Sequence, residues 1–384
     1  MEAYVFAKTV ENNKIEESLE LLLLKLGGLG KFVSNGNKVL IKPNMFLEAS
    51  AESGLITHPK LIIALAKMCK ELGANTLVGE RNGNIHKNFE HYPEIYNYAK
   101  VVDFDNEEIT LRGPCKDNRV IDFPLPLTKS VEEADVIINV PALRTHVLTK
   151  LSNSMKNLMG FLPKFTTKII HLAGLDDAIV DLNKLINIDL TITDAIYSLS
   201  GYYPSDLGQA MYTNFLLAST DPVAIDAIAA DIVGYIPDEI DTIRIGNLTG
   251  IGISDLKKIY FKGDFKKNTS QKYHHPKSGD DIYRYQDKLN IYCENACEKC
   301  RRSLANAIYC FYNENCNLDL DRIKKLNIIT GSADLRNIKK GSNLIFGNCS
   351  KKYSELGLYI AGCPPLTGQA KNALKKLYMQ TFED

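Results

Sequence analysis

Short runs of β-branched and aliphatic residues alternate with segments of helical hydrophobic spacing over roughly the first two-thirds of the chain. This pattern predicts strands at residues 38–42, 76–79, 135–140, 188–193 and 215–218. It predicts helices at residues 59–72, 175–186 and 222–233, the first and last of which begin with a proline. The alternation of strands and helices is typical of an α/β fold, and we expect a mostly parallel, layered sheet.

A polar segment between residues 263 and 281 interrupts this pattern and is rich in Lys, Ser, Asn and Gly. Beyond it we expect a helix at residues 301–312, a strand at 327–330, two strands that end before Cys349 and Cys363, and a terminal helix from Gln369. Because 384 residues exceed the usual size of one hydrophobic core, we predict two domains. These are an α/β domain at residues 1–264 and a smaller, cysteine-containing α/β module at residues 282–384.

The overall charge is balanced, with 46 basic and 46 acidic residues. A balanced chain has no general attraction for polyanions, so nucleic acid is not an expected partner. The first residues lack a basic stretch followed by a long apolar core, and no hydrophobic run is long enough to span a bilayer. The sequence therefore predicts a cytoplasmic protein without membrane contact, and it gives no indication of oligomeric state.

The most specific chemical pattern is a group of cysteines near the C-terminus. Cys297 and Cys300 are separated by two residues before a predicted helix, while Cys349 and Cys363 each follow an apolar strand. A helix start lowers thiolate pKa values, and the carboxyl ends of parallel strands meet at one edge of a sheet. We therefore expect these four cysteines to be metal ligands, with a [4Fe-4S] cluster as the favoured cofactor and zinc as the alternative.

Other interpretations of the cysteines remain open at this stage. Cys349 and Cys363 are also compatible with small buried hydrophobic residues. Cys293, Cys297 and Cys300 have the spacing found in radical S-adenosylmethionine enzymes, but the module that follows them is too short for the barrel of those enzymes. Cys293 is a reserve ligand that would replace one of the other four.

Polar and charged residues cluster after the predicted strands of the larger domain. Because α/β proteins bind ligands at the carboxyl ends of their strands, these side chains predict a site for a small anionic ligand. The alternative is that they are surface charges with one core histidine. The candidate residues are Lys42, Asn44, Arg144, His146, Lys150, Lys156, Asn157, His171 and Asp194.

Four segments together resemble the domain-of-unknown-function 362 family: VLIKPN at 39–44, ITHP at 56–59, MKNLMG at 155–160 and STDPVAID at 219–226. His171 and Asp194 fall between the third and the fourth segment. The sequences around Cys349 and Cys363 also look like the cysteine module that is attached to some members. The resemblance implies an α/β fold and often an iron–sulfur module, but it brings no settled reaction.

These observations favour an iron–sulfur protein in which the cluster exchanges electrons with a small anionic ligand or substrate of the larger domain, as in an oxidoreductase. A binding or scaffold protein with a structural zinc site is the second hypothesis. A third is redox-silent, metal-dependent catalysis in the larger domain. The sequence contains neither a dinucleotide fingerprint nor a phosphate-binding loop after a strand, so NAD and ATP are not expected.

Overall fold

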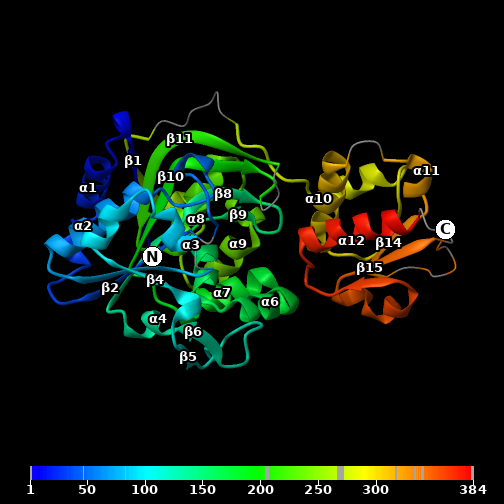
Figure 1. Ribbon diagram of the computed structural model, residues 1–384, viewed down its shortest axis with the longest axis horizontal. Coiled ribbons are helices and arrows are strands. Elements are labelled where there is room, and N and C mark those ends of the chain that lie inside the picture. The colour runs from blue at the N-terminus through cyan, green and yellow to red at the C-terminus, as the bar shows by residue number, and fades with distance from the viewer. Residues whose placement is uncertain are drawn as a thin grey trace.

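The computed structural model consists of two α/β units joined by one segment (Figure 1). It describes residues 2–45, 47–82, 84–203, 207–265, 272–315, 318–332, 334, 336, 338 and 341–381. The larger unit contains the blue to green part of the chain and the smaller unit the orange and red part.

A ten-stranded sheet forms the larger unit. Its order is β12 (Ile259–Gly263), β1 (Ala3–Thr9), β11 (Gly208–Ser219), β10 (Leu190–Gly201), β7 (Val136–Val140), β2 (Lys38–Pro43), β3 (Asn75–Glu80) and β4 (Lys100–Asp103), with β8 (Ala142–His146) beside β10 and β9 (Lys150–Ser152) beside β8. The five strands from β10 to β4 are parallel, whereas β11 is antiparallel to both of its neighbours. The expectation of a mostly parallel α/β sheet is confirmed.

Helices cover both faces of this sheet because successive side chains of a strand point to opposite faces. On β2, Val39 and Ile41 pack in the core that contains α1 (Ile15–Lys25) and α2 (Pro59–Glu71). Leu40 packs in a second core, on the other face. The helices of that face include α7 (Leu175–Leu185), α8 (Pro222–Val233) and α9 (Asp241–Leu248), with α5 (Ser154–Asn157) and α6 (Lys164–Ala173) close by.

Smaller elements complete the larger unit. Helix α3 (Asn84–Asn88) follows β3, and α4 (Lys129–Glu133) precedes β7. Strands β5 (Ile109–Arg112) and β6 (Leu125–Thr128) form a separate antiparallel pair.

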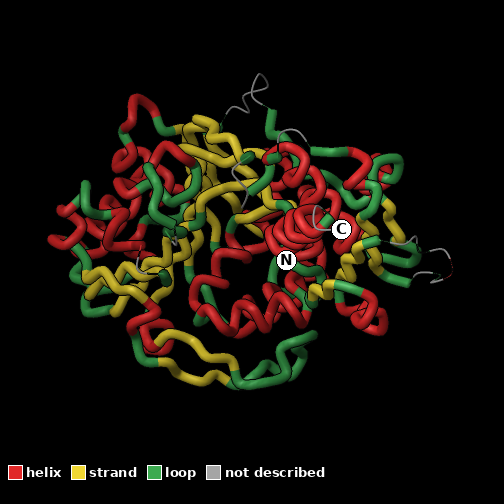
Figure 2. Tube along the Cα trace, turned by 45° about the vertical axis from the view of Figure 1, so that its right-hand side comes forward, coloured by secondary structure: helices red, strands yellow, loops and turns green. Residues whose placement is uncertain are grey.

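The smaller unit is built on a four-stranded parallel sheet in the order β13 (Asn290–Tyr292), β14 (Leu326–Thr330), β15 (Ser342–Phe346) and β16 (Leu358–Ile360). Helices α10 (Glu298–Glu314) and α12 (Thr367–Gln380) share one hydrophobic core with this sheet, and α11 (Leu320–Ile323) precedes β14. Figure 2 shows this second helix-and-strand layer beside the larger unit. Within the described ranges, no helix combines the length and the hydrophobicity needed to cross a membrane.

Most predicted elements are present with boundaries shifted by a few residues, and α8 has the predicted limits. The main difference lies in β10 and β11, which run for 12 residues each as one long antiparallel pair. The first half of β11 is exposed or only partly buried and mixes polar with apolar residues, so it lacks the apolar run that identified residues 215–218. Strand β1 was not predicted.

Candidate functional site

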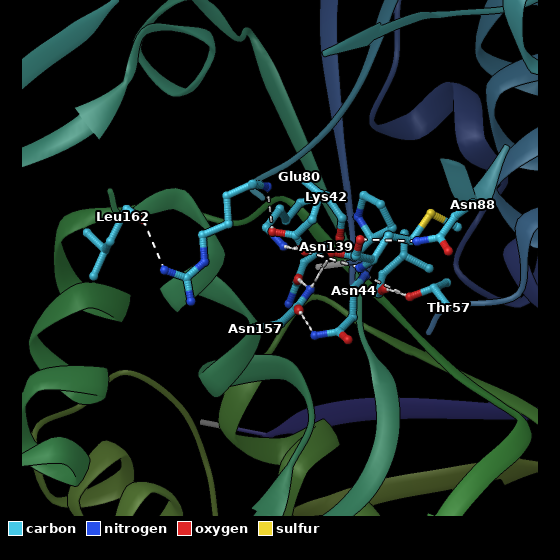
Figure 3. Close-up of polar contacts among 12 residues, drawn as sticks. Lys42, Asn44, Thr57, Glu80, Asn88, Asn139, Asn157 and Leu162 are labelled. Carbon is cyan, nitrogen blue, oxygen red and sulfur yellow. Dashed lines mark hydrogen bonds and ion pairs between the residues drawn. The ribbon is translucent and has the colours of Figure 1, made fainter. Parts of the chain in front are cut away.

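A buried ion pair marks the carboxyl ends of β2 and β3. The Lys42 ammonium lies 2.7 Å from the Glu80 carboxylate, and the two side chains are 0% and 2% exposed. Lys42 also donates to the Pro43 carbonyl, and Glu80 accepts from the backbone N–H groups of Met45 and Arg81 (Figure 3). Burial lowers the pKa of Lys42, and the Glu80 carboxylate opposes that shift. The pair is thus a fixed, electrically neutral part of the site.

Next to this pair lies a cavity of about 300 Å³. It contains most of the side chains that the sequence suggested for an anionic ligand, although they come from four separate segments of the chain. The lining residues with polar or aromatic side chains are Lys42, Asn44, Glu80, Arg81, Arg144, His146, Ser152, Lys156, Asn157, Thr167, His171, Tyr203, Thr367 and Gln369. Leu366 and Gly368 complete the part of the wall that comes from the smaller unit.

Three asparagines form a chain of hydrogen bonds beside the cavity, and Figure 3 shows them next to one another. Asn44 donates to Asn157 (3.1 Å), and Asn157 donates to Asn139 (2.8 Å). Asn139 in turn donates to the Ser154 carbonyl at the start of α5 (3.0 Å). The amide groups of Asn44 and Asn157 are therefore used mainly within the protein, which rigidifies the cavity wall.

Two guanidinium groups line the cavity without an acidic partner in the described part of the chain. Arg144 donates to the Leu55 carbonyl and to Asn44, and its guanidinium stacks 4.4 Å from the centre of the Tyr203 ring. Arg81 donates to Thr167 (2.7 Å) and to the Leu162 carbonyl. The Nε atoms of both arginines are buried and have no hydrogen-bond partner among the described residues. Their positive charges are compensated only by neutral oxygens, which favours an anion in the cavity.

Lys156 is the third cationic candidate, and its environment differs from that of Lys42. Its ammonium makes no hydrogen bond or ion pair with any residue that the structure describes. Burial, followed by the charges of Arg144 and Arg81, lowers the pKa of Lys156 to about 7, although the Asp176 carboxylate opposes the shift. At neutral pH a substantial share of this side chain is therefore an uncharged amine.

Both histidines of the cavity are neutral at physiological pH. Nδ1 of His146 accepts the N–H groups of Leu148 (3.1 Å) and Thr149 (3.3 Å), so the ring proton is on Nε2. Burial, with a further contribution from the Lys156 charge, lowers the pKa of His146 well below its ordinary value and that of His171 to about 4. Within the described residues, Nδ1 of His171 is buried and has no hydrogen-bond partner.

Two aspartates position the helices behind the site. Asp226, on α8, accepts the backbone N–H groups of Ser154 (2.8 Å) and Met155 (3.1 Å) and so fixes the first turn of α5, which carries Lys156. Asp221 caps α8 by accepting from the N–H groups of residues 223 and 224. Asp226 is thus a positioning residue.

Two of the proposed ligand-binding residues lie outside the cavity. Lys150 donates to the Glu239 carbonyl (2.9 Å) because the left-handed backbone conformation at this residue, with φ of 63°, turns the chain there. Asp194 accepts the N–H groups of His58 (2.6 Å) and Ile196 (2.9 Å), so it ties β10 to the start of α2. The structure places the other seven candidates in the cavity wall.

The four candidate ligand cysteines come from three loops at one end of the smaller sheet. Cys297 is the N-cap residue of α10, Cys300 lies in its first turn, and Cys349 and Cys363 follow β15 and β16. Hydrogen bonds from the Cys300 thiol and from the N–H groups of Cys300 and Lys299 lower the pKa of Cys297 to about 5. The pKa of Cys300 is raised by Cys297, by burial and by the charges of Cys363 and Cys349. The four thiols therefore lie within electrostatic range of one another.

This grouping is looser than a preformed single-ion site. Among the described residues, no set of three or more histidine, cysteine or acidic side chains has the geometry of a bound metal ion. Cys293 is buried, and its pKa is raised by burial and by Glu294. Arg301 on α10 and Tyr283 oppose this shift. The named groups that act on the pKa of Cys293 do not include the four candidate ligand cysteines.

The cysteine loops contact the larger unit at α6. The Cys363 N–H donates to the His171 carbonyl (3.2 Å), and the Asn348 side chain donates to the Leu172 carbonyl (3.0 Å). Next to these contacts, Lys299 forms ion pairs with Asp176 (2.9 Å) and Asp241 (3.2 Å). Residues 366–369, which follow the Cys363 loop and begin α12, complete the wall of the cavity.

Sequence reasoning missed several residues of the site. Arg81 lies two residues after the predicted strand at 76–79, and that position was the available signal for it. Tyr203 and residues 366–369 carry no comparable signal, because they reach the cavity only through the pairing of β10 with β8 and the docking of the smaller unit.

Part of the chain is similar to known proteins. The model of a family described as "Domain of unknown function (DUF362)" matches residues 39–231. The thylakoid-associated protein sll1697 of Synechocystis sp. is 28% identical over 256 residues, which cover 64% of this chain and 78% of that protein.

Among solved structures, the lactate racemase apoprotein from Thermoanaerobacterium thermosaccharolyticum aligns with a TM-score of 0.40 and 15% identity. The alignment covers 60% of this chain and 57% of that protein, so this chain spans less than two-thirds of its length.

Proposed function

This chain belongs to the DUF362 family, and from that premise we propose that it is an iron–sulfur protein with a small-anion site beside its cysteines. Since the family is defined by a domain of unknown function, the proposal depends on the chemistry of the two neighbouring sites. In it, the cysteines hold a [4Fe-4S] cluster that exchanges electrons with the anion or with a redox partner.

The anion site is supported by the charge balance of the cavity. Lys42 and Glu80 neutralise one another, whereas Arg81 and Arg144 have no acidic partner in the described part of the chain. A buried cation that lacks a counter-charge is costly, and a carboxylate or phosphate oxygen would satisfy both guanidinium groups. A small anion is therefore the ligand that best complements this cavity.

The donor set fits a metal cofactor that prefers sulfur. The Cys300 thiol, followed by the backbone N–H groups at the start of α10, lowers the pKa of Cys297 to about 5, which favours its thiolate form at neutral pH. The pKa of Cys300 is raised by its hydrogen bond to the Cys297 sulfur, by burial and by the negative charge of Cys297, and the pKa of Cys363 is raised by burial and then by repulsion from Cys297. A positively charged iron–sulfur core would remove that repulsion and favour loss of the thiol protons. Cys297, Cys300, Cys349 and Cys363 are the residues that would hold it.

One observation carries the link between the two sites. His171 contributes its side chain to the cavity, and its backbone carbonyl accepts the Cys363 N–H. Cys363, a ligand of the proposed cluster, and the anion site are therefore joined through a single residue, His171. A redox centre placed there needs no large movement of the protein to influence a bound anion.

The proposal is tested by anaerobic purification followed by quantification of iron and acid-labile sulfide. The expected result is a brown protein with broad absorption at roughly 400 nm, four irons per chain and loss of both features in Cys363→Ser. Cys115→Ser is the matched control, because Cys115 lies away from the cluster loops and should keep the full iron content. Stoichiometric zinc without sulfide would contradict the redox proposal and support a binding protein with a structural metal site instead.

A further inference from the structure

We propose that Lys156 is a nucleophile that forms a Schiff base with a small 2-oxo acid bound in the cavity. The inference deepens the proposed anion site by naming the class of its ligand, and that part of it depends on the proposed function. It assigns a catalytic role to Lys156 that is separate from the role of the cysteines.

The placement of Lys156 is the first argument. Its side chain lines the cavity from the short helix α5, which Asp226 holds through two backbone hydrogen bonds. Within the described residues, its amine has neither a hydrogen bond nor an ion pair. A lysine kept beside two guanidinium groups, without a partner, costs folding free energy, and such a cost is common at functional sites.

Lys42 and Lys156 differ in the contacts of their side-chain amines. Both lysines line the same cavity, but Lys42 is held by the Glu80 carboxylate at 2.7 Å and by the Pro43 carbonyl. A paired ammonium is a poor nucleophile because its lone pair carries a proton. Lys156 makes no such contacts in the described part of the chain, and burial together with the charges of Arg144 and Arg81 favours its uncharged form against the weaker effect of Asp176. The structure therefore separates a structural lysine from a reactive one.

The remaining lining groups fit a carboxylate next to a carbonyl. Arg81 has an unpartnered Nε and lies with Arg144 near Lys156, so the two guanidinium groups can receive the carboxylate of the ligand. His146 carries its ring proton on Nε2, which makes it a hydrogen-bond donor for the oxygen of the adjacent carbonyl. A cavity of about 300 Å³ has room for a ligand of a few heavy atoms.

The reaction needs no oxidant or reductant. The amine nitrogen of Lys156 attacks the carbonyl carbon, and the resulting carbinolamine loses its oxygen together with the two amine hydrogens as one water. A carbon–nitrogen double bond replaces the carbon–oxygen double bond. The positive charges around the site favour the substrate carboxylate, and the protonated imine would withdraw electrons from the neighbouring carbon.

Reductive trapping tests the assignment directly. The purified full-length protein is incubated with glyoxylate, pyruvate or 2-oxoglutarate and with sodium cyanoborohydride, and its peptides are analysed by mass spectrometry. The expected result with at least one acid is a single reduced adduct on Lys156. At pH 7 a lysine with a pKa of about 7 holds roughly a thousand times more neutral amine than an exposed lysine, so Lys156 should be labelled first.

Two variants and one probe serve as controls. Lys156→Arg should abolish the adduct, whereas Lys150→Gln should retain it, because Lys150 is nearby in sequence but lies outside the cavity. Acetone, which has a carbonyl but no carboxylate, should label Lys156 at least about tenfold more slowly than the best acid, equivalent to about 1.4 kcal/mol. Circular dichroism of both variants checks that they are folded.

The proposal is overturned if none of the three acids labels Lys156, or if Lys156 is labelled no faster than exposed lysines. Equal labelling by acetone would overturn the assignment of a 2-oxo acid. Iron and sulfide are quantified on the same samples. Iron-free protein that still traps an acid on Lys156 would contradict the cluster and support the lysine, and iron-loaded protein without trapping would do the opposite.

Discussion

Replacing Glu80 with glutamine should destabilise the protein strongly, and the effect should depend on pH in a defined direction. Glutamine preserves the shape of the side chain, but its single carbonyl oxygen can replace only one of the two carboxylate oxygens that accept the Met45 and Arg81 N–H groups. It removes the negative charge that faces the Lys42 ammonium at 2.7 Å. Because the Lys42 side chain is fully buried, its amine must then either remain charged without a partner or lose its proton.

The free-energy cost of removing the proton from Lys42 sets an upper limit on the loss of stability. Deprotonating an amine whose ordinary pKa is about 10.4 costs about 1.36 kcal/mol per pH unit, or roughly 4.6 kcal/mol at pH 7. Removal of one partner from a buried ion pair typically costs about 3–5 kcal/mol, which agrees with this limit. We therefore expect Glu80→Gln to lower the free energy of unfolding by about 3–5 kcal/mol at pH 7.

The pH dependence follows from the number of bound protons. In the folded variant Lys42 is neutral, whereas in the unfolded variant it keeps its proton up to about pH 10. The unfolded state then binds more protons, so the stability of the variant rises with pH by about 1.4 kcal/mol per unit. The deficit should thus shrink to roughly 2 kcal/mol at pH 9.

Urea denaturation of the wild type and the variant at pH 7, 8 and 9 measures this difference. In Lys42→Met/Glu80→Gln no buried amine remains, so most of the lost stability should return. Glu133→Gln is the exposed control, since its ion pair with Lys38 is about half exposed and should contribute less than about 1 kcal/mol. A loss for Glu80→Gln that is below about 1 kcal/mol, or that is the same at pH 7 and 9, would refute the reasoning.

Two further predictions concern the supports of the site. Burial raises the pKa of Asp226 to about 7, so the folded state binds more protons than the unfolded state between about pH 4 and 7, and stability should fall as pH rises through that window. The side chain in Asp226→Asn cannot titrate, so the decrease in the free energy of unfolding between pH 5 and 7 should be smaller than in the wild type, by up to about 1.4 kcal/mol per pH unit. Urea denaturation at both pH values measures this difference, and an unchanged pH dependence would contradict the assignment. Lys299→Met leaves Asp176 and Asp241 without their shared cation and should weaken docking of the smaller unit by about 1–3 kcal/mol, which limited proteolysis between the units would detect as faster cleavage. Lys371→Met removes an ion pair within the smaller unit and should leave that cleavage rate unchanged; equal acceleration in both variants would exclude a specific role for Lys299.

The layered core could be predicted from the sequence because its strands and helices are recognisable from the local spacing of apolar residues. The apolar run at 39–41 and the helix at 222–233 bury almost every residue, so their pattern is strong. The first half of β11 is exposed or only partly buried, and its place in the sheet depends on pairing with β10. Such pairing is a long-range property that local spacing does not encode.

The sequence predicted which residues form most of the candidate site, but it did not predict the role of each one. Lys42 and Lys156 are both basic residues of the candidate site in sequence, yet in the described structure Lys42 forms an ion pair with a carboxylate and Lys156 does not. Lys150 and Asp194 have the expected chemistry, but local backbone geometry directs them to Glu239 and to the start of α2. The roles are set by partners that lie far away in the sequence.

The wall that residues 366–369 contribute has a thermodynamic consequence. Any molecule that fills the cavity contacts both units at once and therefore stabilises their docking. Because coupling is reciprocal, a change that favours docking of the two units must raise the affinity for that molecule by the same factor. Ligand binding and docking of the two units are therefore thermodynamically linked.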